Sequence, residues 1–318
     1  SETDEDDLAE LMVGREVQLT VDRGESHPAE PMLQVEDLHV AGGHGGDVVD
    51  GVSLEVRAGE ILGVAGVAGN GQDELVEAIT GLRQPRSGTI MLDGEDVTSD
   101  GTRDLHGKNV AYVPADRHRF GLVLSFPLTD NAVLTDYYME PYSHGVIRDE
   151  GAIAKRADEA IAQYDVRTPS ATVTAGTLSG GNQQKLIVAR EFDRELKLLV
   201  LDQPTRGLDV GSIEFIHKQV IDKRDAGTAV LLVSAELDEV LELSDRIAVM
   251  YRGKLVAVVD GRTANKEEVG LLMATGGRAE GTSSQGAASG STGCSAARCV
   301  LSSPSPRAPW CSPSWWVR

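Results

Sequence analysis

Cysteine and positive charge are both scarce in this sequence. The three cysteines all lie close to the C-terminal end, at irregular spacing and with no histidine nearby. This arrangement matches no zinc-site pattern and argues against a disulfide framework. Lysine is rare beside arginine, and the formal net charge of the 318 residues is −20. A chain with this balance lacks the basic stripe of a nucleic-acid-binding surface, so we expect no nucleic-acid partner.

Long apolar runs are missing as well. No stretch approaches the roughly 18 apolar residues of a membrane span. Residues 1–7 are acidic, which is the reverse of a signal peptide. We therefore expect a cytoplasmic protein that meets a membrane only through partners. A dense carboxylate surface also suits solubility at high salt. A halophilic source is thus a hypothesis, and full folding without salt together with insensitivity to KCl would contradict it.

From residue 32 the hydrophobic pattern alternates between strands and helices. Residues 33–40 and 48–56 alternate as half-buried strands, the second with an expected turn at Asp50-Gly51. Residues 60–66 are continuously apolar, which is typical of a strand buried on both faces. Further strands are predicted at 87–94, 110–114, 196–202, 229–234, 245–250 and 254–259, and helices at 130–136, 152–166 and 267–273.

A glycine-rich loop follows the apolar run at 60–66 and precedes an apolar-periodic helix. Strand, glycine-rich loop and helix are the setting of a phosphate-binding loop. The frame GxxxxGK[ST] is matched at its glycines, but Gln72 replaces the lysine and Asp73 replaces the Ser or Thr that ligates Mg²⁺. An amide offers only a dipole and Asp73 adds a like charge, so nucleotide binding here should be weak. A simple glycine turn without phosphate stays open on this motif alone.

Residues 178–185, Leu-Ser-Gly-Gly-Asn-Gln-Gln-Lys, open another apolar-periodic helix. Gly180 and Gly181 leave backbone N–H groups bare at the helix N-terminus, where the dipole favours a polyphosphate, and Ser179 adds a hydroxyl donor. The run resembles the signature motif of ATP-binding cassette (ABC) proteins. In that family the motif closes over ATP held by a partner cassette. The resemblance therefore implies that Ser179, Gly180, Gly181 and Gln183 act in trans on a second cassette.

Residues 196–202 end at Asp202 and are similar to the Walker B strand of ABC proteins, in which the aspartate positions Mg²⁺. The next residue, usually Glu, is Gln203, whose amide orients water but cannot take its proton. The resemblance implies ATP and Mg²⁺ as cofactors, with Asp202 as a weak metal ligand. The nucleotide-binding residues that it implies are Gly66, Gly69, Asn70, Gly71, Gln72, Asp73, Asp202 and Gln203.

The departures from the family pattern all fall on one half of the catalytic machinery. The lysine, the glutamate and the histidine expected after the strand at 229–234 are replaced by Gln72, Gln203 and Ala235. The signature motif is intact. So are residues 204–209, which resemble the D-loop, the segment of ABC proteins that contacts the partner cassette. Random loss of function would not be confined to the residues of the cassette's own ATP site. We therefore predict a cassette that completes its partner's ATP site while its own is degenerate. A catalytically inactive cassette serving as a regulatory or scaffold module is the alternative.

The loop after the strand at 110–114 is less decisive. In second cassettes of ABC sugar importers the residue at this position is usually acidic, whereas this chain has Ala115. A role of that side chain in coupling the nucleotide site to membrane subunits is therefore in doubt. The basic residues Arg117, His118 and Arg119 follow. Contact with an acidic partner surface and a solvated loop both stay open here.

Two segments, residues 203–211 and Leu-Met-Val-Gly-Arg-Glu at 11–16, are similar in sequence to segments of two-cassette ATPases of simple-sugar and nucleoside ABC importers. The resemblance implies a P-loop NTPase of the α/β class with a RecA-like core, an antiparallel β-subdomain and a helical signature subdomain. It makes this the second, C-terminal cassette, peripheral at the cytoplasmic face of the membrane. The implied partners are a first cassette, in the same full-length polypeptide, membrane permease subunits and an extracellular solute-binding protein.

We expect three regions: an inter-cassette linker at 1–31, the cassette at 32–275 and a tail at 276–318. The tail is rich in Gly and Ser, then in Pro, and is almost free of acidic residues. This composition predicts disorder. Because it opposes the composition of the rest of the chain, a shifted reading frame is a further hypothesis. ABC-type DNA-repair and chromosome ATPases share the signature motif but need a long coiled coil, for which the sequence has no pattern.

Overall fold

The computed structural model describes residues 23–43 and 45–277. Most of the predicted linker, including the segment at 11–16, and nearly all of the predicted tail lie outside the described residues. Among those described, no helix is both long and apolar enough to cross a bilayer.

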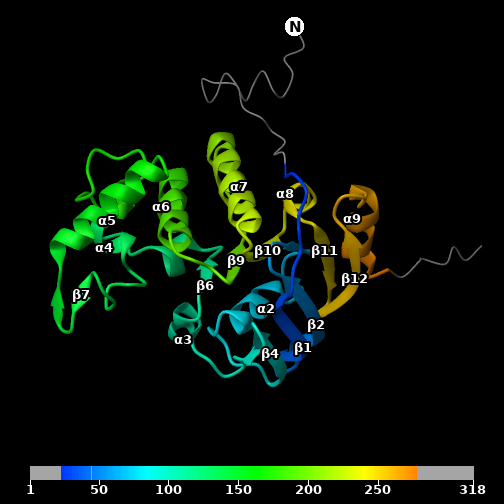
Figure 1. Cartoon of the computed structure of the whole chain (residues 1–318). Coiled ribbons are helices and arrows are strands. Elements are labelled where there is room, and N and C mark those ends of the chain that lie inside the picture. Colours follow the sequence, from blue (N-terminus) through cyan, green and yellow to red (C-terminus); the bar gives the residue numbers. More distant parts are fainter. Residues whose placement is uncertain (1–22, 44, 278–318) are drawn as a thin grey trace, which may run out of the picture. The chain divides into compact units, whose positions relative to one another are not determined.

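A six-stranded sheet forms the centre of the described structure (Figure 1). Its order is β12-β11-β3-β10-β9-β6, and all neighbours are parallel except the edge pair β11 and β12. The central strands are continuous apolar runs with every residue buried, as expected of a parallel sheet covered on both faces. The strands are β3 (Ile61–Ala65), β6 (Val110–Val113), β9 (Leu198–Asp202), β10 (Ala229–Ser234), β11 (Arg246–Tyr251) and β12 (Lys254–Asp260).

A second sheet is antiparallel, in the order β2-β1-β4-β5. Its strands are β1 (Pro31–Ala41), β2 (Asp47–Arg57), β4 (Ser87–Leu92) and β5 (Glu95–Asp96). The predicted turn at Asp50-Gly51 is wrong, because β2 continues through it. His39 pairs with Asp50 and Leu38 with Val52, so Gly51, at φ 70°, is the extra residue of a bulge. A bulge needs the same glycine as a turn, and the sequence does not distinguish them.

The helices that carry the signature motif gather on one side of the central sheet, where α4, α5 and α6 pack on one another (Figure 1). A small hairpin of β7 (Ser143–His144) and β8 (Ile147–Arg148) accompanies them, and no sequence pattern predicts such two-residue strands. The helices are α2 (Gln72–Ile79), α3 (Thr102–Gly107), α4 (Leu128–Ala132), α5 (Glu150–Gln163), α6 (Gly180–Phe192), α7 (Val210–Asp225), α8 (Leu237–Leu243) and α9 (Lys266–Thr275).

Two buried charges anchor α6 to its surroundings. Arg190 is 4% exposed; its Nε donates to Glu191 at 2.8 Å and its Nη1 to the Gly121 carbonyl at 2.8 Å. Buried ion pairs persist only where such extra hydrogen bonds satisfy the remaining donors. This fixes the signature helix relative to the segment that follows β6. The predicted combination of an α/β core, an antiparallel β-subdomain and a helical subdomain is confirmed.

The last residues of the predicted linker pack against the cassette. Arg23 donates through Nη1 to the carbonyl of Ser244 at 2.7 Å and through Nη2 to that of Gly261 at 3.2 Å. The backbone N–H of Ala29 donates to Ala58 at 2.9 Å. The end of α8 therefore has its free carbonyl groups satisfied by a residue from before the cassette's first strand. The contacts of the cassette begin earlier than the predicted boundary at residue 32.

Candidate functional site

Three motifs meet at the carboxyl ends of neighbouring parallel strands. The glycine-rich loop follows β3, Asp202 ends β9, and Ala235 follows β10. Val233 of β10 pairs with Val64 on one side and with Asp202 on the other. The crevice beyond the carboxyl ends of such strands is where open α/β sheets bind ligands. The candidate site therefore lies here.

Gln72 folds back onto its own loop. Its side chain is 6% exposed, its Nε2 donates to the Val67 carbonyl at 3.1 Å, and its Oε1 accepts from the backbone N–H of Asn70 at 3.0 Å. A Cβ on Gly66 would lie 2.3 Å from Gln72 Nε2, so the loop has no room for another residue there. Gln72 thus occupies one of the N–H donors of the phosphate-binding loop.

The loop is also braced from outside. Gly71, at φ 102°, requires glycine, and a Cβ there would lie 2.3 Å from the Val48 carbonyl. Asn70 Oδ1 accepts from the backbone N–H of Arg252 at 2.8 Å, and the Asn70 carbonyl accepts from Gly253 at 2.9 Å. Gly69 has open space around its Cα. The predicted residues 66–73 are therefore together in one rigid loop with an open face at Gly69.

Asp202 lies beneath the loop at the end of β9 and is 5% exposed. Burial raises the pKa of this carboxyl to about 7, and the negative charge of Asp73 contributes in the same direction. Hydrogen bonds from the Ala115 N–H and the Tyr112 hydroxyl partly oppose the shift. Asp202 is thus predicted to be half ionised near neutral pH when no cation is bound.

We expect Asp202→Asn to stabilise the metal-free protein at high pH. In the unfolded chain the carboxyl ionises near its ordinary value of 3.8, whereas the folded protein keeps the proton to about pH 7. The free energy of unfolding should therefore fall between these pH values, because the folded state binds the extra proton. In EDTA at pH 8 the variant should be more stable than the wild type by about 2–4 kcal/mol, with little difference at pH 4. Urea unfolding at both pH values measures this, and an equal difference at each would contradict it.

The residues present fit a divalent cation. Oδ1 of Asp202 is enclosed and has no hydrogen-bond partner among the described residues. A carboxylate oxygen is the ligand that Mg²⁺ prefers. Asp202 would hold the ion, which would neutralise charge on a bound polyphosphate.

Gln203 adopts a left-handed backbone conformation, at φ 50°. Its backbone N–H donates to the Val233 carbonyl at 2.8 Å, and its Oε1 accepts from the backbone N–H of Ala235 at 3.2 Å. The side chain therefore contacts the segment where a histidine was expected. In this conformation Gln203 links β9 to the end of β10.

Ser179 begins the signature helix as its N-cap. The side chain is exposed and its Oγ accepts from Asn182 Nδ2 at 2.9 Å. Gln183 is different: it is 5% exposed and its Nε2 donates to the carbonyls of Ala175 and Leu178, at 3.3 and 3.2 Å. Ser179 is accessible to a partner, whereas the amide of Gln183 supports the turn before the helix.

The first turn of α6 passes close to the start of α7. A Cβ on Gly181 would lie 2.4 Å from Ser212 Oγ and 2.9 Å from Asp209 Oδ2. That hydroxyl donates to Asp209 at 2.8 Å, in the N-terminal cap of α7. Gly181 is therefore required by the close approach of the two helices.

Gly181→Ala should destabilise the protein by about 1–3 kcal/mol, because the added methyl group displaces the Ser212–Asp209 cap. Gly180→Ala is the matched control. Its Cβ would meet Arg117 Nη2 at 2.9 Å, which is the end of a flexible side chain. Alanine also favours a helix over glycine by up to about 1 kcal/mol, so this variant should be close to neutral. Urea unfolding measures both, and equal losses would contradict the packing argument.

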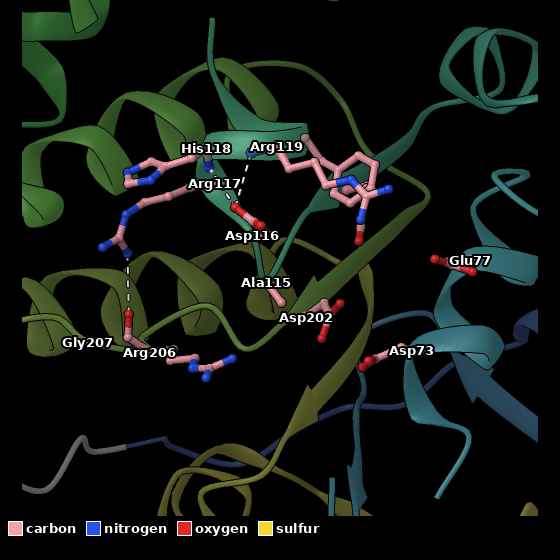
Figure 2. Close-up of a pocket in the computed structure, with 12 residues that line it drawn as sticks. Asp73, Glu77, Ala115, Asp116, Arg117, His118, Arg119, Asp202, Arg206 and Gly207 are labelled. Atoms are coloured by element: carbon pink, nitrogen blue, oxygen red, sulfur yellow. Dashed lines mark hydrogen bonds between the residues drawn. The ribbon is translucent and has the colours of Figure 1, made fainter. Parts of the chain in front are cut away.

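The segment after β6 contacts both the signature helix and the D-loop, which the sequence left open. His118 Nε2 lies 3.0 Å from Gln183 Oε1, and Arg117 Nη1 donates to the Arg206 carbonyl at 3.3 Å. Asp116 holds this turn by accepting from two backbone N–H groups (Figure 2). Arg117 thus contacts the D-loop backbone of its own cassette, while His118 and Arg119 are exposed. An aspartate before three basic residues was the available signal for a capped turn.

A cavity of about 530 Å³ lies between this turn, α2 and the end of β9 (Figure 2). Asp73 and Glu77 of α2 and Asp202 of β9 line one side. The other side is lined by the turn itself, with Asp116, Arg117, His118 and Arg119, and Arg206 also belongs to the lining. Of the predicted nucleotide-binding residues, Asp73 and Asp202 line this cavity, whereas Ser179 of the signature motif lines a separate one.

The family model described as "ABC transporter" matches residues 49–206, about half of the chain. The match includes the glycine-rich loop, the signature motif and the Asp202 strand that the structure brings into one fold. The chain belongs to the ABC transporter ATP-binding cassette family.

The curated relatives of this cassette are longer proteins, and it matches about half of each. It is 48% identical over 273 residues to the guanosine import ATP-binding protein NupO of Bacillus subtilis, covering 86% of this chain and 54% of the relative. It is 44% identical over 278 residues to the glucose import ATP-binding protein TsgD13 of Haloferax volcanii, covering 87% and 50%. The chain spans about half the length of the curated relatives that it matches.

Solved ABC cassettes share the fold. One is a nucleotide-free ATP-binding cassette from an ABC transporter, with a TM-score of 0.64, 22% identity and coverage of 77% of this chain and 96% of that one. Another is the ADP conformation of MJ1267, an ATP-binding cassette of an ABC transporter, with a TM-score of 0.62, 21% identity and coverage of 78% and 96%. At this identity the likeness shows the fold alone.

Proposed function

We propose that this cassette provides its signature motif to the ATP site of a second cassette, while its own phosphate-binding loop forms a degenerate site. The observation that carries the proposal is the contrast between two glycine motifs. Ser179 is exposed at the N-terminus of a 13-residue helix, with free backbone N–H groups behind it. Gln72, in contrast, brings no positive charge to its loop and occupies one of its N–H donors.

The transported solute class follows from the relatives. The similar proteins are named as importers of guanosine, nucleosides, glucose and ribose. We propose that the cassette serves an importer of simple sugars or nucleosides, together with permease subunits and an extracellular solute-binding protein, at the cytoplasmic face of the membrane. The match covers only about half of each relative, which supports a first cassette in the same polypeptide. A halophilic source stays a proposal that rests on the acidic composition alone.

ATP hydrolysis by the purified chain, alone and mixed with a candidate first cassette, tests the proposal. We expect no turnover by the chain alone, because Gln203 cannot take a proton from water and no lysine meets the phosphates. The mixture should hydrolyse ATP. Robust turnover by the isolated chain would refute the degenerate site. Each first cassette is chosen because it is active when paired with its own partner. If none of the mixtures hydrolyses ATP, the alternative of a regulatory or scaffold module is favoured.

A further inference from the structure

The acidic wall of the cavity lacks a counter-charge. Figure 2 shows the carboxylates of Asp73 and Asp202 pointing toward one another across the space between α2 and β9. Neither forms an ion pair with any of the described residues, whereas the third acidic residue, Glu77, lies 2.7 Å from Arg83 Nε. Two adjacent carboxylates without a cation repel one another.

One of the two carboxylates has an orphaned atom. Asp202 is 5% exposed, and its enclosed Oδ1 has no hydrogen-bond partner in the part of the chain that the structure describes. Native structures leave few buried polar atoms unsatisfied, and each such atom calls for an unrecorded partner. Asp73 lines the same cavity from the first turn of α2, at the position where the phosphate-binding-loop pattern has a neutral hydroxyl.

The basic residues that line the cavity form no ion pair with these two carboxylates in the part of the chain that the structure describes. Gln72 stands where a lysine ammonium would enter the cavity, and its amide is engaged with its own loop. On the opposite wall, Arg117 donates to the Arg206 carbonyl. The two carboxylates are therefore left without an ion-pair partner among the described residues, and a cation from solution can neutralise them.

We propose that Asp73 and Asp202 bind a divalent cation of the Mg²⁺ or Mn²⁺ type directly, in the absence of nucleotide. Mg²⁺ commonly takes one or two carboxylates and keeps several waters, and the cavity has room for them. The replacement of a neutral hydroxyl by Asp73 converts a site that normally needs phosphate oxygens into one with two charged protein ligands. The inference rests on the proposed function, in which this site is degenerate. The ion would hold α2 to β9 in a site that has lost its lysine.

The other acidic cluster of the chain provides the internal comparison. His39, Asp47 and Asp50 offer ligand atoms within 4.8 Å of one another. Their carboxylates already have partners, since Arg86 lies 2.8 Å from Asp47 and Lys254 lies 2.9 Å from Asp50. This cluster therefore carries no site, and its variants serve as controls.

Titration of the full chain with Mn²⁺, followed by electron paramagnetic resonance of the free ion and without nucleotide, tests the inference. We expect one tight site, with affinity reduced at least about tenfold by Asp73→Thr and by Asp202→Asn. Glu74→Thr removes the same charge from the same turn of α2 without lining the cavity, and Asp50→Asn disrupts the other cluster; both should bind as the wild type does.

Three results would overturn the inference: no saturable Mn²⁺ binding, binding that appears only when ATP is added, or equal loss in Glu74→Thr and Asp73→Thr. Asp73 is exposed, so Asp73→Thr tests the inference without altering the buried core. Because the measurement needs neither ATP nor a partner cassette, its failure leaves complementation of a first cassette untouched. Failure of complementation likewise leaves the Mn²⁺ result standing.

Discussion

Ser179→Arg should reduce ATP hydrolysis by the paired cassettes roughly 100-fold or more, the loss typical when a donor to the reacting group is removed. Ser179 is exposed at the start of α6, where the hydroxyl and the bare N–H groups meet the partner's nucleotide in the proposed function. A long guanidinium side chain at this position fills the space of the phosphates. The cassette itself should lose only about 1 kcal/mol of stability, the usual cost of an N-cap.

Ser170→Arg is the matched control, because Ser170 is also exposed and belongs to the loop between α5 and α6. Its hydroxyl bonds only to Thr172, at 2.9 Å and 3.3 Å. Steady-state ATPase rates of mixtures with each variant give the comparison, and circular dichroism verifies folding. Undiminished turnover with Ser179→Arg, or equal loss with both variants, would rule out a role of the signature motif in trans.

The double substitution Gln72→Lys with Asp73→Thr should raise the affinity of the isolated chain for Mg²⁺-ATP at least about tenfold. It adds a full positive charge next to the phosphates and removes a negative one, and it frees the Asn70 N–H that Gln72 now occupies. Threonine also restores a hydroxyl ligand for a nucleotide-bound Mg²⁺. Titration with a fluorescent ATP analogue measures the change.

Glu74→Thr separates this effect from a general change of charge, since Glu74 lies in the same turn but does not line the cavity. We expect its affinity to stay within about twofold of the wild type, because charges exposed to salt are screened. Hydrolysis should not appear in the double variant, as Gln203 still lacks a proton acceptor. Equal affinities of the wild type and the double variant would mean that Gln72 and Asp73 do not limit nucleotide binding.

Much of the site was predictable because its motifs are local. The glycine-rich loop, the signature helix and the strand that ends at Asp202 each depend on fewer than ten consecutive residues, in which backbone freedom and apolar periodicity determine the conformation. The replacements at Gln72 and Gln203 are equally visible in the sequence. The predicted strands and the signature helix were confirmed for this reason.

Other features could not be predicted from the sequence, because they depend on contacts between residues that are distant in the chain. Gln183 lies in the signature motif, yet it is buried, and its contact with His118 spans 65 positions. Arg117 reaches Arg206 over 89 positions. The bulge at Gly51 depends on pairing with β1, since the same glycine would also suit a turn. Hydrogen bonds of this kind exist only after the strands and helices have packed.

The sequence by itself determined the family, the order of the motifs and which chemical groups are missing, because these depend on residue identity and short-range spacing. Only the tertiary structure decided that Gln72 turns into its own loop, that Ser179 and Asp202 line separate cavities, and that Asp73 shares a cavity with Asp202, whose Oδ1 has no hydrogen-bond partner among the described residues. These contacts form where parallel strands from distant parts of the chain end next to one another. No local sequence pattern predicts which strands become neighbours.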